Sequence, residues 1–553
     1  MSQALRRYYI EMISRERGTI RKDWGGKVTF CLLFPNYYRV GISNLGFQFV
    51  YALLNLRKDV VCERAFLPEP WALREHQRTN TPLLSVESLS PLNRFDVLAF
   101  SLPYENDYPN VLRMLELGRI PLLSEQRGPH DPLVVAGGAA ISMNPEPMAP
   151  FFDCILVGEA EGLLDSFVDA LKRHWGSSRE EMLRQLARVD GVYVPSLYEM
   201  LLNEDGTMKG LHPRSDDLPQ KVKRIWFEGQ PSLLSAPLIS PQGEFGESVL
   251  VEVARGCPYR CKFCSVRSLY HPFRPRSLES LKEAIAEGIR RTGKVGLLGA
   301  AVASHPYFEE LCQLVLDLRG RLSVSSLRAD RITPSLARIL SASGQRTATL
   351  APETGSEGLR HTIGKHISNE RLLETVETLA QQGITNLRLY FMVGLPGEKE
   401  EDLKATIRLI KEIVHRQRTI LKGNRSEITV SLSPFVPKPW TPFQWCSFEG
   451  LGQIKAKLKE IRRSLPGIRV HHDLPKWAYW EALFSLGDRR LGLMLYRGYT
   501  EGDWMAYLKL SLLNPDFWVL RKKGREETFP WEIVDYGITR EDLWEELMLY
   551  EGR

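Results

Sequence analysis

Three of the eight cysteines of this 553-residue chain lie within eight positions, in the stretch RGCPYRCKFCSV. Cys257, Cys261 and Cys264 would place three thiols on one loop. A structural zinc site, a redox disulfide and an iron–sulfur cluster all use thiols in this way. The three kinds of site differ in what else they require from the chain.

The surrounding sequence separates these alternatives in part. A zinc site needs a fourth ligand, for which His271 is the nearest candidate, and usually a second CxxC pair, which is missing. A disulfide exchanger would leave the third cysteine without a role. A four-iron cluster on three cysteines leaves one iron open to a substrate or cofactor. The spacing therefore favours the cluster, with zinc as the alternative.

The cysteines lie at the start of a regular alternation of strands and helices. Strand patterns appear at SVLVEVARG, KVGLLGA, LSVSSLRAD, TATLAPE, NLRLYFMVG and EITVSLSPF, with helix patterns such as LESLKEAIAEGIRR between them. Parallel strands need helical crossovers, so residues 246–447 predict a partial (β/α)6 barrel of the TIM type. With six strand–helix units, two fewer than a closed eight-unit barrel, we expect it to be open. The cysteines follow the first strand, at the edge where such barrels carry their chemistry.

CPYRCKFC resembles the CxxxCxΦC motif of the radical S-adenosylmethionine superfamily, whose fold is this partial barrel. LLGAA, VSSLRAD, TLAPETGSEGLR, LRLYFMVGLPGE and SLSPFVPKPWTPFQW resemble its later strand ends. The resemblance implies a 4Fe–4S cluster on the three cysteines, with S-adenosylmethionine on the open iron. It also implies these contacts to S-adenosylmethionine: Phe263, Gly299, Ser326, Arg328, Glu353, Arg388 and Gly394.

The same resemblance implies the chemistry. One electron cleaves S-adenosylmethionine to a 5′-deoxyadenosyl radical, which removes a hydrogen atom from a substrate. A low-potential donor such as a flavodoxin or ferredoxin would supply that electron. Taken alone, Glu353 also fits a turn and Arg328 a surface ion pair. Arg388 lies on a strand that looks buried, where a guanidinium needs an anionic partner.

Residues 27–175 predict a second α/β domain, a doubly wound, Rossmann-like parallel sheet of about five strands. It lacks GxGxxG and GxxxxGK[ST], so a dinucleotide or nucleoside triphosphate is not indicated. VVAGGAA followed by ILVGEAEGLL resembles the cobalamin-binding domain that precedes many radical S-adenosylmethionine barrels, without its DxHxxG histidine. The alternative is a domain that only supports the barrel. The implied cobalamin contacts are Ser43, Asn44, Ser101, Tyr104, Gly137, Gly138, Gly158 and Glu159.

The remaining segments are predicted as an N-terminal extension (1–26), a linker or strap (176–245) and a mainly helical, aromatic-rich accessory domain (448–553). Six tryptophans lie in the last 83 residues, with RKKGR between them. Such a pattern can stack unpaired bases, but it more often buries a helical subdomain. We therefore expect an active-site cover there and do not favour nucleic acid as a partner.

Composition is ordinary for a globular protein, and the net charge of +6 requires no polyanionic partner. We expect no membrane span, no signal peptide and a cytoplasmic location. The leading hypothesis is a cobalamin-dependent radical enzyme that methylates an unactivated carbon of an unidentified substrate. The alternative is a cobalamin-independent radical enzyme for rearrangement, cyclisation or RNA modification. A more distant alternative is a non-catalytic iron–sulfur or zinc protein that binds nucleic acid.

Overall fold

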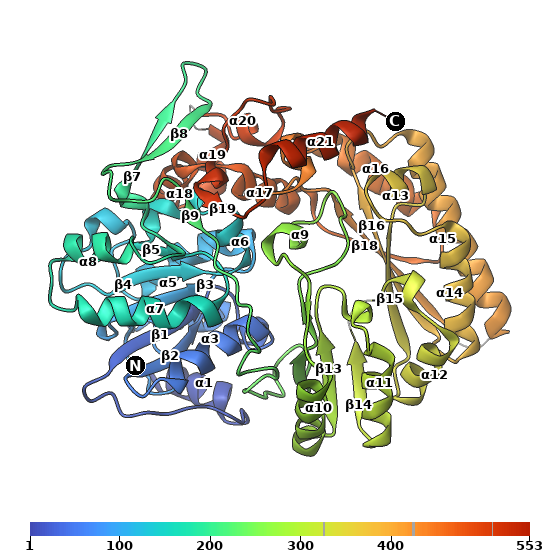
Figure 1. Cartoon of the computed structure of the whole chain (residues 1–553), viewed down its shortest axis with the longest axis horizontal. Coiled ribbons are helices and arrows are strands. Elements are labelled where there is room, and N and C mark those ends of the chain that lie inside the picture. The colour runs from blue at the N-terminus through green and yellow to red at the C-terminus, as the bar shows by residue number, and fades with distance from the viewer. Residues whose placement is uncertain (325–326, 423–425, 511–512, 553) are drawn as a thin grey trace. The chain divides into compact units, whose positions relative to one another are not determined.

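The computed structural model describes residues 1–324, 327–422, 426–510 and 513–552. The chain forms two compact units (Figure 1). The first comprises residues 1–247, 483–518 and 526–537, and the second comprises 248–482, 519–525 and 538–553. Residues 448–553, expected to form one accessory domain, are thus divided between the units, because their segments pack against the cores of both. None of the helices in these ranges combines the length and apolarity needed to cross a bilayer.

The first unit is built on a six-stranded sheet of order β2-β1-β3-β4-β5-β6. The strands are β1 (Val28–Phe34), β2 (Val60–Phe66), β3 (Val97–Ser101), β4 (Leu133–Gly137), β5 (Cys154–Leu156) and β6 (Val192–Tyr193). β1 to β5 are parallel and β6 is antiparallel. Every residue of β1 and β2 is buried, as expected for strands covered on both faces. The doubly wound, Rossmann-like prediction is confirmed.

Crossover helices cover both faces of this sheet. They include α3 (Leu45–Leu56), α4 (Pro70–Arg78), α5 (Tyr108–Leu117) and α7 (Ala160–Arg173). Phe47 and Tyr51 of α3 and Phe167 of α7 share a core with Phe30 and Leu32 of β1. The unit also contains α1 (Gln3–Ile13), α2 (Tyr38–Gly41), α6 (Ala139–Met143), α8 (Arg179–Leu186), α18 (Arg489–Thr500) and α19 (Trp504–Leu510).

The predicted linker contributes to the first unit throughout. It contains the hairpin of β7 (Tyr198–Leu202) and β8 (Met208–Pro213), and then β9 (Val222–Lys223), which pairs with β19 (Val534–Asp535). After β9 the chain crosses the end of β5, where Gly158 and Ile225 form an isolated bridge. We call residues 222–227 the strap.

The second unit is an open barrel of parallel strands. One sheet has the order β10-β13-β14 and another β15-β16-β17-β18, and a parallel bridge between Leu327 and Leu350 continues the series. The strands are β10 (Val249–Glu252), β13 (Lys294–Leu298), β14 (Arg321–Val324), β15 (Thr347–Glu353), β16 (Asn386–Val393), β17 (Glu427–Pro434) and β18 (Arg469–His472). The six predicted strands are confirmed, and β18 is a seventh that the prediction missed. Its sequence RVHH has no apolar run, because it is a largely exposed edge strand.

Helices flank the barrel strands (Figure 1). They are α10 (Leu278–Thr292), α11 (Phe308–Asp317), α12 (Pro334–Ala342), α13 (Glu357–Thr362), α14 (Asn369–Gln381), α15 (Glu400–Leu421) and α16 (Leu451–Ser464). The short helix α9 (Val266–Leu269), η8 (Pro442–Trp445) and α21 (Arg540–Glu551) belong to the same unit. α17 (Pro475–Leu486) begins within it.

Candidate functional site

The loop that carries the three cysteines lies between β11 (Ala254–Arg255), a short strand that follows β10, and α9. Gly256 has φ +83°, and an added Cβ would lie 2.4 Å from the carbonyl oxygen of Tyr270, so only glycine fits. The amide of Cys264 donates to the Cys261 carbonyl at 3.2 Å. The amide of Lys262 donates to the Ile363 carbonyl at 2.9 Å, which fastens the loop to the segment after α13.

The three loop cysteines differ from the other five in exposure. Cys257, Cys261 and Cys264 are partly exposed, whereas the others are buried: Cys31, Cys62, Cys154, Cys312 and Cys446. Burial raises the pKa of all three loop thiols, that of Cys264 to about 12. The positive charges of Lys365 and Arg328 act in the opposite direction on Cys257 and Cys261.

The donor set fits an iron–sulfur cluster. Thiolates are its usual ligands, and the nearby cations favour the thiolate form. Within the described ranges, no three His, Cys, Asp or Glu side chains converge on a single metal ion. Zinc, with His271 as fourth ligand, stays the alternative for this loop on sequence grounds alone.

Tyr259, inside the cysteine loop, connects it to the ends of the next two barrel strands. The Arg328 guanidinium stacks on its ring at 3.6 Å from the centroid, and Asp330 accepts from the same guanidinium at 3.0 and 3.1 Å. The Tyr259 hydroxyl accepts from Ser304 and Arg331 at 3.1 and 3.0 Å. Tyr259 was not among the predicted residues, although an aromatic residue within CPYRC was an available signal.

Glu353 ends β15 in a strained conformation. Its φ is +67°, which is uncommon for a residue with a side chain, and the pairing register shifts between Leu350 and Glu353. The Glu353 carboxylate pairs with the Lys365 ammonium at 2.6 Å, and both side chains are largely buried. Lys365 was not predicted, because its contact depends on how α13 returns the chain to the end of β15.

Arg360 of α13 explains why the chain returns to the end of β15. Its fully buried guanidinium donates to the carbonyl oxygens of Pro352, Thr354 and Ile367, at 3.2, 3.1 and 2.8 Å respectively. Burial lowers the pKa of Arg360 to about 10. By gathering carbonyls on both sides of Glu353, Arg360 holds the end of β15 in place.

Gly394 begins the loop after β16, with φ +81°. Its amide donates to the Glu398 carboxylate at 2.8 Å. Lys457 of α16 pairs with Glu398 at 2.8 Å and with Glu449 at 2.7 Å. The loop for which the resemblance implies a contact to S-adenosylmethionine is therefore held by a half-buried ionic cluster.

Most of the residues implied to contact S-adenosylmethionine lie at one edge of the barrel. Phe263 is in the cysteine loop, and Gly299, Arg328, Glu353 and Gly394 end or follow successive strands. Ser326 lies outside the described residues.

Arg388 departs from the expectation. It is exposed on β16, because Leu387, Leu389 and Phe391 occupy the buried face of the strand. The predicted burial of the Arg388 guanidinium is therefore wrong, since alternate residues of a strand face opposite sides of the sheet. Whether Arg388 contacts S-adenosylmethionine stays a prediction.

In the first unit, the glycines at the strand ends approach the protein's own backbone. Gly138 has φ +124°, and an added Cβ would lie 2.7 Å from the Leu102 carbonyl oxygen. Gly158 has φ +131°, and an added Cβ at this position would lie 2.1 Å from the Ile225 carbonyl oxygen. At Gly137 an added Cβ makes only an ordinary contact. Close packing of the chain therefore accounts for Gly138 and Gly158 without a ligand.

Several of the other implied cobalamin contacts also have partners in the chain. Glu159 accepts from the Phe227 amide of the strap at 3.1 Å, Ser43 from the Glu244 amide at 2.7 Å, and Asn44 caps α3 by accepting from the Phe47 amide at 2.9 Å. Ser101 is partly exposed at the end of β3, and Tyr104, in the loop after it, is 42% exposed.

A buried carboxyl that the sequence analysis missed lies beside these loops. Asn36, after β1, donates to Asp107, after β3, at 2.9 Å. Burial raises the pKa of Asp107 to about 7, and the charge of Glu105 adds to the effect. β1 and β3 are neighbours at which the strand order reverses, the position where doubly wound sheets bind ligands.

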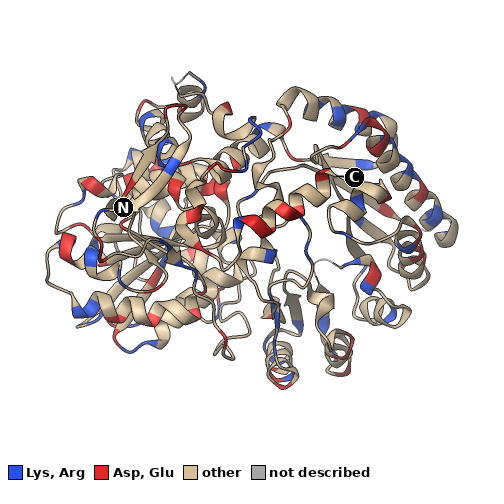
Figure 2. Ribbon diagram, turned by 45° about the horizontal axis from the view of Figure 1, so that its top comes forward, with Lys and Arg blue, Asp and Glu red and all other residues tan. Residues whose placement is uncertain are grey.

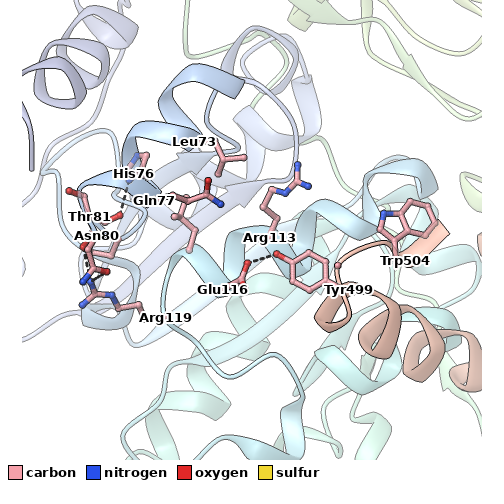
Figure 3. A pocket seen from close by; sticks show the side chains of 13 residues that line it. Leu73, His76, Gln77, Asn80, Thr81, Arg113, Glu116, Arg119, Tyr499 and Trp504 are labelled. Carbon is pink, nitrogen blue, oxygen red and sulfur yellow. Dashed lines mark hydrogen bonds between the residues drawn. The ribbon is translucent and has the colours of Figure 1, made fainter. Parts of the chain in front are cut away.

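A cavity of about 460 Å³ lies elsewhere in the first unit (Figure 3). It is lined by the ends of α4 and α5 and by Tyr499 and Trp504. Glu116 accepts from the Tyr499 hydroxyl at 2.5 Å. Crossover helices run antiparallel to the strands, so their carboxyl ends lie towards the amino ends of the strands. The cavity contains none of the implied cofactor residues and is not the candidate site.

Comparisons with known proteins identify the family to which the barrel belongs. Residues 251–410 match the family described as the radical SAM superfamily, and residues 46–195 match radical SAM proteins, N-terminal. An uncharacterized protein of Methanocaldococcus jannaschii is 30% identical over 469 residues, 84% of this chain and 90% of that one. An uncharacterized methyltransferase of Pyrococcus horikoshii is 23% identical over 51% of this chain and 58% of its own length.

Among solved structures, the radical S-adenosylmethionine methyltransferase TsrM from Kitasatospora setae, with cobalamin and a cluster bound, is 15% identical. The TM-score is 0.46, over 73% of this chain and 72% of that chain. The chain belongs to the radical S-adenosylmethionine superfamily. Membership makes it an enzyme with a 4Fe–4S cluster and S-adenosylmethionine as cofactors.

Proposed function

We propose that this radical S-adenosylmethionine enzyme holds its cluster on Cys257, Cys261 and Cys264 and transfers a methyl group to an unactivated carbon, with cobalamin bound to the first unit. The loop with three partly exposed cysteines carries this proposal. It follows the first barrel strand, beside charged groups from the ends of the next strands.

The chain's own residues have positioning roles in this scheme. The bound cluster would supply the single electron that opens S-adenosylmethionine. Tyr259 and Arg328 hold the cysteine loop against the end of β14, and Lys365 and Glu353 supply a paired charge at the end of β15. Glu398 keeps the Gly394 loop in a fixed conformation through the Gly394 amide. These contacts fix where a substrate can approach, which is how a protein contributes to radical chemistry.

The first unit supports the cobalamin part of the proposal. Its strand order reverses between β1 and β3, where ligands bind in such sheets. Asn36 and Asp107 join the loops after these two strands, and Tyr104 is exposed beside them. The partial likeness to a protein described as a methyltransferase favours methyl transfer.

A second candidate function is favoured by the strap. Residues 222–227 cross the end of β5, engage Glu159, and occupy the space beside Gly158. If cobalamin does not bind, the first unit is a scaffold. The enzyme would then perform a cobalamin-independent reaction such as rearrangement, cyclisation or RNA modification.

An electron donor is part of either function, because the cluster must be reduced before it can cleave S-adenosylmethionine. We infer a flavodoxin or ferredoxin in a reducing cytoplasm, where the thiols would stay reduced. Acidic and basic residues are intermixed along the described helices (Figure 2), so nucleic acid is not the favoured partner.

The test is anaerobic reconstitution with iron, sulfide and hydroxocobalamin, followed by measurement of bound iron and corrinoid. We expect about four irons and one corrinoid per chain, and 5′-deoxyadenosine after addition of S-adenosylmethionine and a strong reductant. Four irons without corrinoid would contradict the methyltransferase and favour the second candidate. No cleavage of S-adenosylmethionine by an iron-replete protein would contradict both.

A further inference from the structure

The helix α21, near the carboxyl end of the chain, contacts the loop that carries the cysteines. The Glu546 carboxylate accepts two hydrogen bonds from the Arg267 guanidinium, both at 2.7 Å, and one from Arg260 at 2.9 Å. Arg260 lies between Cys257 and Cys261, and Arg267 lies three residues after Cys264. One side chain of α21 therefore holds the cysteine loop from both sides.

The burial of these groups makes the contact stronger than an ordinary surface ion pair. The Arg267 side chain is only 7% exposed and that of Glu546 is 20% exposed, whereas Arg260 is 75% exposed. A bidentate pair between a guanidinium and a carboxylate is a strong, directional contact. Removing the charge of Glu546 would leave a buried guanidinium without its ionic partner, which costs more than losing an exposed pair.

The same helix also contacts the loop after β16. The Tyr550 hydroxyl, one turn after Glu546, donates to the Pro396 carbonyl oxygen. Pro396 lies two residues after Gly394. Glu546 and Tyr550 are four residues apart and so project from one side of the helix. α21 thus connects the cysteine loop with the Gly394 loop.

α21 is itself anchored by its apolar side. Leu543, Leu547 and Tyr550 are buried at helical spacing. The Tyr550 ring packs against Phe443 at 4.8 Å and the Trp544 ring against Trp445 at 5.1 Å, both on η8. On the other side of the loop, Ser268 donates to the Trp440 carbonyl at 2.6 Å. Because α21 is packed firmly in this way, its contacts can restrict the motion of both loops.

We propose that α21 is a brace, in which Glu546 and Tyr550 are positioning residues that hold the cysteine loop and the Gly394 loop in one fixed relation. The inference rests on the proposed use of the three cysteines as cluster ligands. Its consequence is that a substitution far along the chain changes how firmly iron is retained. It also changes how S-adenosylmethionine is held, although α21 contributes no cysteine.

The test compares E546Q with E545Q, which makes the same change of charge at an exposed neighbouring position on the helix. In the reconstituted proteins, hydrogen–deuterium exchange is measured for peptides covering residues 254–270 and 394–399. We expect faster exchange in both segments for E546Q and exchange like that of the wild type for E545Q. Y550F, which keeps the ring and removes the hydroxyl, should increase exchange in 394–399 more than in 254–270.

Cluster behaviour provides the second readout. Iron transfer from the reduced protein to a chelator should be about tenfold faster in E546Q, a change equivalent to about 1.4 kcal/mol, because the neutral amide of glutamine cannot replace the bidentate ion pair with Arg267. The electron paramagnetic resonance spectrum of the reduced cluster should show a weaker response to S-adenosylmethionine. Exchange in segments away from the two loops should match that of the wild type, which distinguishes a local brace from a general loss of stability.

The outcomes separate the brace from the proposed function. If E546Q and E545Q exchange alike in residues 254–270, the brace is wrong, whatever the iron content. If exchange rises in E546Q but the wild-type protein binds no iron, the brace stands and the assignment of the cysteines fails. Faster exchange with unchanged iron release would contradict the consequence for the cluster.

Discussion

Both units present the carboxyl ends of parallel strands, yet the two edges differ in what occupies them. At the barrel edge, three partly exposed thiols lie beside the paired charges of Arg328 with Asp330 and Lys365 with Glu353. At the edge of the first sheet, the backbone of the strap and of a neighbouring loop packs closely against Gly158 and Gly138, and Glu159 accepts a hydrogen bond from the strap. Side chains with definite chemistry therefore locate a site better than glycines do, because tight packing of the chain also requires glycine.

The largest effect expected from this comparison concerns the barrel edge. C261A should abolish cluster binding and all cleavage of S-adenosylmethionine. The substitution removes one of the three thiolates that hold the cluster, and the two that remain are too few to retain it. Bound iron and the yield of 5′-deoxyadenosine measure this. C312A, at a buried cysteine of α11, is the control and should retain both. Cleavage that persists in C261A would remove the three cysteines from the site.

The first edge can be tested through its glycines. G158A should lower the free energy of unfolding by about 2–4 kcal/mol, because alanine is strained at φ +131° and its Cβ would collide with the strap. G137A is the matched control and should change it by less than about 1 kcal/mol. Chemical denaturation measures both. A stable G158A protein with reduced corrinoid binding would instead assign Gly158 to a ligand.

Asp107 predicts a pH dependence at the same edge. Burial raises the pKa of Asp107 from 3.8 to about 7, so between these values the folded protein retains a proton that the unfolded chain has released. Its contribution to stability is therefore lost as pH rises through this window. D107N cannot ionise and still accepts from Asn36, so its stability relative to the wild type should increase by about 2–4 kcal/mol from pH 4 to pH 8.

The control for this prediction is D190N, at an exposed position. Urea denaturation at several pH values should give D190N and the wild type parallel profiles, with only D107N flatter. Parallel profiles for all three proteins would mean that Asp107 titrates at its ordinary pKa. Corrinoid binding by D107N would then show whether the carboxyl is needed at the switch point between β1 and β3.

The smallest effect is expected at Arg388, which the sequence placed in the site for a reason that the structure does not support. R388A should change the free energy of unfolding by no more than about 0.5 kcal/mol, because the side chain is exposed. The contact that the resemblance implies predicts that R388A weakens S-adenosylmethionine binding while the cluster persists. R408A on α15 is the control. An unchanged dissociation constant would exclude Arg388 from the site.

Features that depend on local pattern could be predicted from the amino-acid sequence alone. Alternating apolar residues and helical periodicity located the five parallel strands of the first sheet and six strands of the barrel. Three cysteines after the first barrel strand indicated both the kind of ligand and the edge of the barrel. β18 was not predicted, because an exposed edge strand needs no apolar run. The burial of Arg388 was predicted wrongly, because the elements that pack against a strand decide which of its two faces is buried.

Contacts between residues that are distant in the sequence became known only from the folded chain. Glu353 meets Lys365 because Arg360 gathers three carbonyls around the end of β15. Gly158 meets Ile225, 67 positions further on, and Arg267 meets Glu546 at a separation of 279 positions. Local sequence specifies the periodicity of an element and the chemistry of its side chains. Which residue contacts a given buried charge or glycine depends on how the elements pack together. Packing also decides which hydrogen-bond or charge partner each buried polar group obtains.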